Sequence, residues 1–366
     1  MNKKIIKFAV LALLLLSMTG CTKILKDKNN KVVKYDSELV CTSCENVCSG
    51  TKNEYDVLKE KDSLNDEEKS KLSELEEKLS TCSKDCNNKC ELSKKNQTGQ
   101  TLTSNILCQP TNEDVKLIYE LNNVNVKSLP SCTNFNINSG GYEGLWTSLL
   151  VKPLAWLILK LGSFLKNYGI SLILITLFIR TLMMPLTKST AMQSENIKKA
   201  KPELDSIEKK YKDKRDQESI MKKSQETMAI YKKYSINPLS SCLFALLQIP
   251  LLFSFIEAIN RTPAIFEENL LGFKLGVTPL IAFSNGEWWY IIIVILLGVI
   301  TFLSFNLNKT ASASLDTQNQ MNIMNKIFIV MIIFMSLSMS TAISIYWITS
   351  STITVIQNIL VKRSKK

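Results

Sequence analysis

The sequence contains no histidine among its 366 residues. Histidine is the side chain that most often serves as a general acid or base near neutral pH. The sequence also has no glycine-rich phosphate loop outside its apolar runs and no paired carboxylates within them. A single cysteine in an apolar run, Cys242, has no neighbouring base, and we interpret it as a packing residue. These absences argue against an enzyme.

Apolar and charged residues are abundant, but they are segregated along the chain. Apolar residues make up 45%, and 45 Lys and Arg against 33 Asp and Glu leave a formal charge of +12. Residues 22–140 are polar and rich in cysteine, whereas residues 145–361 are long apolar runs broken by one basic segment. This segregation predicts two regions with different solvents, water and lipid.

The first 20 residues have the pattern of a secretion signal. Three lysines within Met1–Lys7 precede a short apolar run, and the segment ends in "SMTGC" at Cys21. The apolar run is too short to span a bilayer. Residues 1–20 resemble a lipoprotein signal peptide, which implies a lipid-modified Cys21 at the mature N-terminus. The alternative is an uncleaved signal anchor, and in both cases residues 21–144 face away from the cytoplasm.

Six cysteines flank a charged stretch in this extracytoplasmic segment. Asn65 or Asp66 is a favourable helix N-cap, followed by acidic residues in the first turn. The residues after it repeat at intervals of three and four, typical of a coiled-coil seam: Leu72, Leu75, Leu79, Cys82 and Cys86. We therefore predict an antiparallel helical hairpin over about 41–90, with a turn near residues 64–65. Gly50 is the position most able to interrupt its first helix.

The antiparallel geometry selects one pairing from the fifteen that six cysteines allow. In such a hairpin the residue numbers of each facing pair add up to the same total, here 130 or 131. The predicted disulfides are Cys48 to Cys82, Cys44 to Cys86 and Cys41 to Cys90, with Cys108 and Cys132 left as a fourth pair. The alternative is a zinc site, but an outward, oxidising location without histidine favours disulfides. We expect the hairpin to stiffen this segment or to dock to a partner.

The rest of the chain predicts an all-α polytopic membrane protein with a five-span core. Residues 145–167 carry Lys152, Lys160 and Lys166 among apolar residues, which is typical of an amphipathic helix lying in the membrane interface. The predicted spans are residues 168–187, 238–259, 287–307, 325–341 and 343–361. Residues 188–236 form a basic helical hairpin and residues 362–366 a basic tail, and both belong in the cytoplasm by the positive-inside rule.

The basic hairpin allows two interpretations. It can be a solvated, charged hairpin that only fixes the orientation of the chain. It can also be a landing surface for ribosomal RNA, anionic lipid or targeting factors.

Polar residues inside three of the predicted spans lie at similar depth. Arg180 shares a helix face with Thr176, and two further faces are formed by Asn237, Ser241 and Gln248 and by Tyr346, Ser350, Thr354 and Gln357. Intramembrane polar residues normally face a bundle interior or a watery cavity. We therefore predict a hydrophilic pocket that opens to the cytoplasm. The alternatives are that Arg180 snorkels to the headgroups and that the hydroxyl residues serve helix packing.

Three stretches of the spanning region resemble the YidC family of membrane protein insertases. They are "KPLAWLILKLGSFLKNYGISLILITLFIRTLMMPLT", "YKKYSINPLSSCLFALLQIP" and "IYWITSSTITVIQN", and the resemblance covers residues 145–362. It implies an intramembrane groove with one arginine, matched by Arg180, that receives the hydrophilic tail of an incoming membrane protein without nucleotide, metal or other cofactor.

The resemblance also implies partners and a location. The partners are nascent membrane proteins, together with the ribosome, targeting factors and the general translocation channel. The location is the cell membrane, as in lipoprotein-type members from bacteria with a single membrane. A small-anion transporter or channel using the same pocket is the alternative function, but the sequence shows no internal repeat. Residues 22–144 have no counterpart in the simple members of the family.

Overall fold

The computed structural model describes residues 22–363, apart from 36, 62, 213, 215 and 308–314. Only the backbone is described for residues 186, 187, 189–191, 194, 238–247, 307, 315–322, 324 and 362. The predicted signal peptide, the predicted lipidation site Cys21 and the end of the basic tail lie outside the described residues. The described chain is mainly helical, as the sequence predicts, with one two-stranded sheet.

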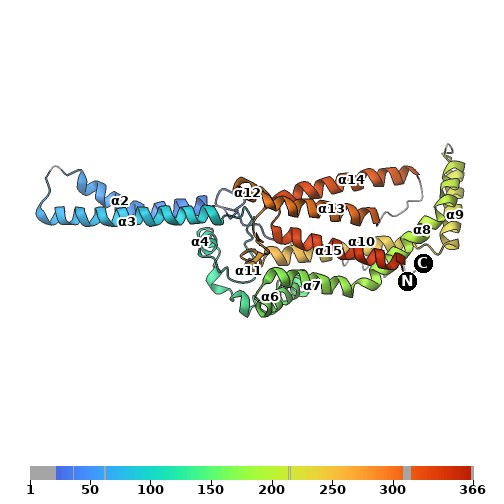
Figure 1. Cartoon of the computed structure of the whole chain (residues 1–366), viewed down its shortest axis with the longest axis horizontal. Helices are drawn as coiled ribbons and strands as arrows, with labels where there is room; N and C mark the ends of the chain where they lie inside the picture. The colour runs from blue at the N-terminus through green and yellow to red at the C-terminus, as the bar shows by residue number, and fades with distance from the viewer. Residues whose placement is uncertain are drawn as a thin grey trace.

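A helical bundle occupies the middle of the molecule, and one helical hairpin projects from each end (Figure 1). At one end the hairpin consists of α2 (Glu38–Lys59) and α3 (Asp66–Asn96), and at the other end of α8 (Met184–Lys210) and α9 (Gln217–Lys233). The long bundle helices are α7 (Tyr168–Leu182), α10 (Pro238–Asn260), α13 (Ile291–Leu307), α14 (Leu315–Ser338) and α15 (Thr341–Arg363).

Shorter elements surround the end of the bundle nearest α2 and α3. They are α4 (Glu113–Leu121), α5 (Gly144–Trp146), the π-helix η3 (Thr147–Val151), α6 (Lys152–Leu165), α11 (Pro263–Phe266), β1 (Asn269–Leu270), β2 (Phe273–Lys274) and α12 (Pro279–Ser284). Three 3-10 turns complete them: η1 (Val126–Ser128), η2 (Cys132–Asn134) and η4 (Trp288–Tyr290).

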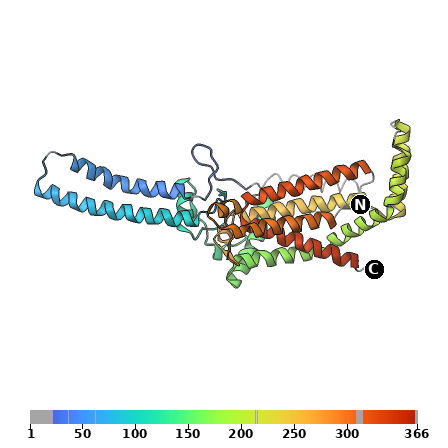
Figure 2. The same ribbon diagram turned by 45° about the horizontal axis from the view of Figure 1, so that its top comes forward.

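The α2–α3 hairpin begins its second helix at the predicted cap. The Asn65 side chain accepts a hydrogen bond from the Glu68 amide, and the Glu68 carboxylate accepts one from the Asn65 amide. This reciprocal capping box satisfies two amides that a helix start leaves unpaired. Gly50 does not interrupt α2, which continues from Glu38 to Lys59. The two helices lie side by side along their length (Figure 2).

Four cysteine pairs are at bonding distance in the structure. The Cα atoms are 4.8 Å apart for Cys41 and Cys90, 5.5 Å for Cys44 and Cys86, 5.9 Å for Cys48 and Cys82, and 4.8 Å for Cys108 and Cys132. Three of the pairs cross-link α2 to α3 in successive turns near the bundle. The α2–α3 hairpin is therefore tied together where it leaves the rest of the molecule.

Residues 22–142, which we call the amino-terminal module, have a hydrophobic core of their own. The buried residues of this core come from residues 25–35, α2, residues 102–106 after α3, α4 and η1. They are Leu25, Val33, Tyr35, Val40, Leu102, Ile106, Val115, Ile118, Tyr119 and Val126. Isolated β-bridges join Ile24 to Thr103 and Lys34 to Thr101. The sequence predicted the helical hairpin and the Cys108–Cys132 pair in this region but not the β-bridges, because single bridges leave no alternating pattern to detect.

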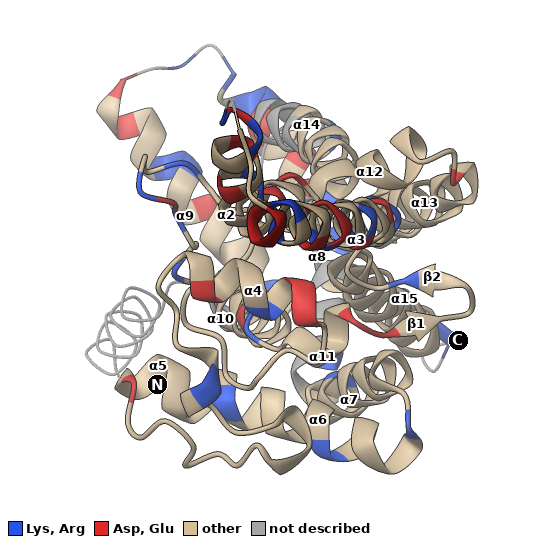
Figure 3. Ribbon diagram, turned by 90° about the vertical axis from the view of Figure 1, so that its left-hand side faces the viewer, with Lys and Arg blue, Asp and Glu red and all other residues tan. Residues whose placement is uncertain are grey.

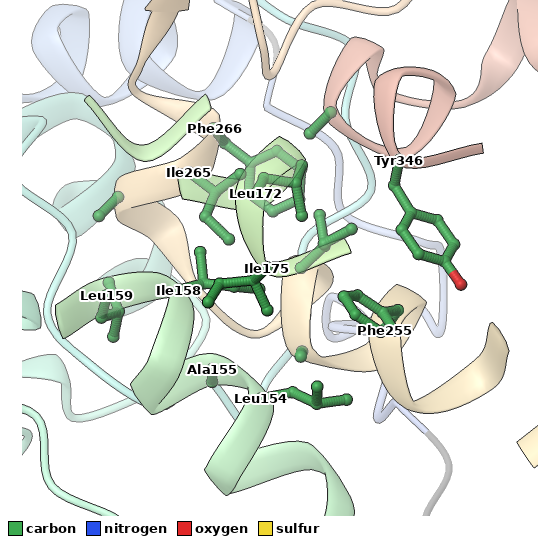
Figure 4. Close-up of a cluster of buried hydrophobic side chains, with 14 of the residues drawn as sticks. Leu154, Ala155, Ile158, Leu159, Leu172, Ile175, Phe255, Ile265, Phe266 and Tyr346 are labelled. Atoms are coloured by element: carbon green, nitrogen blue, oxygen red, sulfur yellow. The ribbon is translucent and has the colours of Figure 1, made fainter. Parts of the chain in front are cut away.

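The core of the bundle lies where α6 packs against α7 and α10 (Figure 4). Ala155 and Ile158 of α6, Leu172 of α7 and Phe255 of α10 are buried there. The Ser171 hydroxyl of α7 donates to the Ile158 carbonyl of α6 at 2.6 Å, so this close contact is also hydrogen-bonded. In contrast to the expectation for a lysine on an interfacial helix, Lys152 is 0% exposed.

The predicted spans and the observed helices differ most at their ends. The predicted first span ends at residue 187, but α7 ends at Leu182 and a new helix starts at Met184. Pro185 explains the break, because proline has no amide hydrogen and favours the first turn of a helix. Helix α14 starts ten residues before the predicted fourth span.

Two described helical stretches have the length and apolarity needed to cross a membrane, Gly144–Leu165 and Trp288–Asn306. Three shorter helical stretches are also apolar: Tyr168–Leu182, Gln248–Asn260 and Asn325–Ser338. Seen from the α2–α3 end, charged residues concentrate on the projecting hairpins, whereas the bundle helices carry few (Figure 3). The bundle is therefore the apolar part of the molecule.

Candidate functional site

Arg180 lies between three helices of the bundle. Its side chain extends from α7 and is 8% exposed. The Nη1 atom donates to Gln248 Oε1 of α10 at 2.9 Å, and the Nη2 atom donates to the Ser350 hydroxyl of α15. The Gln357 side chain of α15 donates to the Arg180 carbonyl at 3.0 Å. The structure thus brings together polar residues from the three helices that the sequence analysis singled out.

Helix periodicity explains how α15 presents its part of the site. Ser350, Thr354 and Gln357 are separated by four and three residues and therefore share one helix face. Ser350 and Gln357 are buried, and the Thr354 hydroxyl donates to the Ser350 carbonyl at 2.9 Å. Thr354 therefore bonds its own helix and does not bond Arg180.

Two other predicted residues lie near this face without bonding the guanidinium. Thr176 is buried one turn before Arg180 and donates to the Leu172 carbonyl of α7 at 2.7 Å. Tyr346 is buried one turn before Ser350, and its ring stacks on Phe255 with centroids 4.6 Å apart. Figure 4 shows the Tyr346 hydroxyl directed away from the apolar cluster.

Another predicted residue, Asn237, lies next to α8. Asn237 precedes α10 and is exposed, and its amide donates to the Gln193 side chain of α8 at 2.8 Å. It therefore lies toward the α8–α9 hairpin, because the chain enters α10 from α9 at that end. The side chain of Ser241 lies outside the described residues, as does that of Cys242.

The partners of Arg180 are neutral. None of the ion pairs between described residues includes Arg180. A guanidinium carries five N–H donors, and the two bonds to Gln248 and Ser350 use only some of them. Remaining donors of a largely buried cation can bind an incoming carboxylate, and such charge-assisted bonds are stronger than neutral ones. With 8% exposure, the site is nearly closed around the guanidinium rather than widely open.

A second polar cluster, which we call the charge quartet, lies at the bundle end nearest the amino-terminal module. It consists of Glu143, Lys152, Glu257 and Arg261. Arg261 pairs with Glu257 at 3.2 Å and also with Glu143, and Lys152 pairs with Glu143 at 2.9 Å. Two acids and two bases leave the charge quartet neutral, which lowers the cost of burying it.

Neighbouring polar groups complete the charge quartet. The indole of Trp146 donates to Glu257 at 2.7 Å, and Lys152 donates to the carbonyls of Ser139 and Gly141. The sequence patterns did not point to Arg261 or to the burial of Lys152. The available signal was the spacing of Glu257 and Arg261, an acid and a base four residues apart.

Glu143 remains ionised within the charge quartet. Burial raises the pKa of its carboxyl group, but the hydrogen bonds and positive charges of Lys152 and Arg261 outweigh this effect. The pKa of Glu143 is therefore below its usual value. The carboxylate joins the loop before α5 to both α6 and the end of α10.

Sequence comparison identifies the family of the bundle. The family described as "60Kd inner membrane protein" matches residues 160–366, more than half of the chain. The chain is also 33% identical over 241 residues to "Membrane protein insertase YidC" of Oceanobacillus iheyensis, covering 64% of this chain and 91% of that protein. This chain belongs to the YidC family of membrane protein insertases. The resemblance stated from the sequence motifs is thereby confirmed.

Other YidC-family relatives show similar coverage. "Membrane protein insertase MisCA" of Bacillus subtilis is 35% identical over 218 residues, 59% of this chain and 79% of the relative. "Membrane protein insertase YidC 2" of Listeria innocua is 33% identical over 225 residues, 61% of this chain and 74% of the relative. The family match begins at residue 160, so the amino-terminal module lies outside it. Membership supports membrane insertion rather than catalysis.

Proposed function

We propose that this YidC-family insertase receives the hydrophilic segment of a nascent membrane protein at Arg180, while the apolar span of the client moves into lipid. The observation that carries the mechanism is that the largely buried guanidinium has only neutral partners among the described residues. Charges attract each other more strongly in such surroundings than in bulk water. An acidic residue in the client segment is therefore drawn toward Arg180.

The same proposal places the bundle across the cell membrane with five spans. Large apolar side chains are exposed on the outer faces of the bundle helices, as lipid contact requires: Leu174 and Phe178 on α7, Ile292 and Ile295 on α13, and Val330 and Phe334 on α14. The basic α8–α9 hairpin and the disulfide-linked α2–α3 hairpin lie at opposite ends (Figure 1). With α8 and α9 in the cytoplasm, the amino-terminal module lies outside, anchored by the lipid on Cys21.

The energy of transfer comes from the client and the membrane. Burial of the apolar span of the client stabilises the inserted state. The membrane potential contributes about 2.3 kcal/mol per charge per 100 mV. Arg180 and the polar side chains around it reduce the barrier by bonding groups that hydrocarbon leaves unsatisfied.

The α8–α9 hairpin is the surface that we assign to cytoplasmic partners. Its helices pack through buried apolar residues such as Leu204 and Ile230, and exposed ion pairs such as Lys233 with Glu203 also link them. Ile220 and Met221 of α9 are exposed beside basic residues. A basic surface with exposed apolar side chains suits the ribosome, targeting factors or anionic lipid, and the general translocation channel is a further partner.

Insertion in purified liposomes tests this function. The client is a single-span protein with an acidic outer tail, and protease protection of the tail measures its transfer. We expect protection to require the insertase and to fall about ten-fold or more in Arg180→Ala, because a charge-assisted contact is lost. Leu174→Ala, a change to a lipid-facing residue on the same helix, is the matched control and should retain activity.

Each outcome of this experiment has a distinct meaning. A client whose acidic residues are replaced by asparagine should be insensitive to Arg180→Ala. Equal protection by both insertase forms would contradict the role of Arg180 but keep the insertase. Absence of protection with the unchanged protein, together with uptake of a small anion, would instead support a transporter.

A further inference from the structure

The first described residues carry an unbalanced positive charge. We call residues 23–34 the basic turn. It contains one acid, Asp27, and five lysines: Lys23, Lys26, Lys28, Lys31 and Lys34. All five lysines are exposed, and none forms an ion pair with a carboxylate of the described residues. This contrasts with α8 and α9, where several lysines are paired with glutamates.

The basic turn has a defined, hydrogen-bonded backbone conformation. The Asp27 amide donates to the Lys31 carbonyl at 2.9 Å, and the Asp27 carboxylate accepts from the amides of Asn29 and Lys31 at 2.8 Å. Leu25 and Val33 point into the core of the amino-terminal module. Because side chains alternate along extended backbone, the neighbouring residues Ile24 and Val32 face outward and are 49% and 45% exposed.

Hydrogen bonds fix the basic turn close to the end of α10. The Lys23 amide donates to the Asn105 side chain at 3.1 Å, and the Asn105 carbonyl accepts a hydrogen bond from Arg261 at 2.5 Å. Ile24 forms a β-bridge with Thr103, whose hydroxyl donates to the Asn260 carbonyl at 3.3 Å. Asn260 is the last residue of α10. The first residues of the basic turn therefore lie next to the level at which the proposed second span leaves the bilayer.

We propose that the basic turn binds the anionic headgroups of the outer leaflet of the membrane in which the bundle is embedded. Lysines near a membrane surface are attracted to anionic lipid, and their contributions add. Exposed Ile24 and Val32 contact the boundary between headgroups and acyl chains, as the apolar residues of peripheral anchors do. The inference rests on the proposed orientation of the bundle but not on the insertion mechanism at Arg180. It gives the amino-terminal module an attachment to the headgroups, in addition to its contacts with α10 and the proposed lipid on Cys21.

Photo-crosslinking of the full chain in nanodiscs tests this inference. One set of nanodiscs carries photoactivatable phosphatidylglycerol in phosphatidylcholine, and a second set carries photoactivatable phosphatidylcholine only. Peptide mapping then measures the lipid attached to residues 23–34. We expect phosphatidylglycerol to label this peptide about ten-fold more than phosphatidylcholine, since several lysines contribute to its attraction.

The variant Lys26→Gln, Lys28→Gln, Lys31→Gln should lose this preference for phosphatidylglycerol. The variant Lys52→Gln, Lys71→Gln, Lys84→Gln removes three exposed lysines from α2 and α3 and is the matched control, which should keep it. Non-reducing peptide maps of both variants verify that the module is folded.

Two results would overturn the inference. One is equal labelling by the two lipids or no labelling by either, which would mean that the turn does not recognise charged headgroups. The other is loss of the labelling when soluble polyglycerol phosphate is added, which would identify a soluble polyanion as the preferred ligand. Neither measurement requires a client, so failure here is distinguishable from failure of the insertion mechanism.

Discussion

Arg180 and Gln248 are joined by a 2.9 Å hydrogen bond from Nη1 to Oε1, which connects α7 to α10. The acceptor is neutral, so it hydrogen-bonds the positively charged guanidinium of Arg180 without adding an opposite charge. Replacing this amide by a carboxylate keeps the shape and the acceptor while adding an opposite charge. The pair is therefore suited to separating the structural role of Arg180 from its electrostatic role.

We predict that Gln248→Glu lowers the insertion of clients with acidic tails about ten-fold, because the new ion pair competes with the client carboxylate. Insertion of a client with a neutral tail should change little. The measurement is protease protection in liposomes with both clients. Gln248→Ala is the control for the loss of the hydrogen bond alone. An equal loss for the two clients in Gln248→Glu would mean that the charge of Arg180 does not select clients.

Glu257→Gln should destabilise the bundle. The substitution leaves the buried Arg261 with less compensating charge, and removing one member of a buried ion pair typically costs about 3–5 kcal/mol. A fall in the thermal unfolding temperature of the full chain in detergent measures this loss. Glu45→Gln, at an exposed position on α2, is the control and should leave the unfolding temperature within error.

The charge quartet also predicts a dependence on pH. The pKa of Glu143 is lowered in the folded protein, so its contribution to stability is complete above the usual carboxyl range. That contribution is lost as the pH falls through the lowered pKa. Unfolding measured across acidic pH should therefore show a smaller loss of stability in Glu143→Gln than in the unchanged chain. Parallel curves for the two proteins would contradict this assignment.

Replacement by alanine should have opposite effects on stability at two glycines. A Cβ atom at Gly276 would lie 2.7 Å from the backbone oxygen of Phe266. Unlike the end of a flexible side chain, this backbone atom cannot move aside. Gly276→Ala should therefore cost about 1–3 kcal/mol. Gly50 lies within α2 with no neighbouring atom within 4 Å of the added carbon, so Gly50→Ala should stabilise that helix by about 0.5–1 kcal/mol. Thermal unfolding of both variants distinguishes these signs.

Peptide mapping without reduction should recover four linked cysteine pairs. The expected pairs are Cys41 with Cys90, Cys44 with Cys86, Cys48 with Cys82 and Cys108 with Cys132. Removing a native disulfide from a small domain typically costs about 2–5 kcal/mol, so reduction should make α2 and α3 susceptible to protease. A peptide linking Cys41 to Cys44, or zinc released on denaturation, would contradict the pairing.

The family and the helical hairpin followed from patterns that are local in sequence. The spacing of Leu72, Leu75 and Cys82 placed one side of α3 against α2, and the capping residues marked where α3 begins. The same reasoning identified Ser350 and Gln357 as one face of α15. Helical periodicity determines which residues share a face, and an antiparallel turn determines which faces meet.

The tertiary structure decided which of these faces bond and which distant residues join them. Asn237 lies near α8, not at Arg180, and Lys152 is buried because the loop carbonyls of Ser139 and Gly141 surround its ammonium. The amino-terminal module is held on the bundle by buried residues such as Leu107 and Phe135, which join the bundle core, and by bonds such as that from the Leu107 amide to the Arg261 carbonyl. Such contacts join residues more than a hundred positions apart and follow no sequence period. They depend on how whole elements pack, and so the sequence by itself determined the faces of the helices but not their partners.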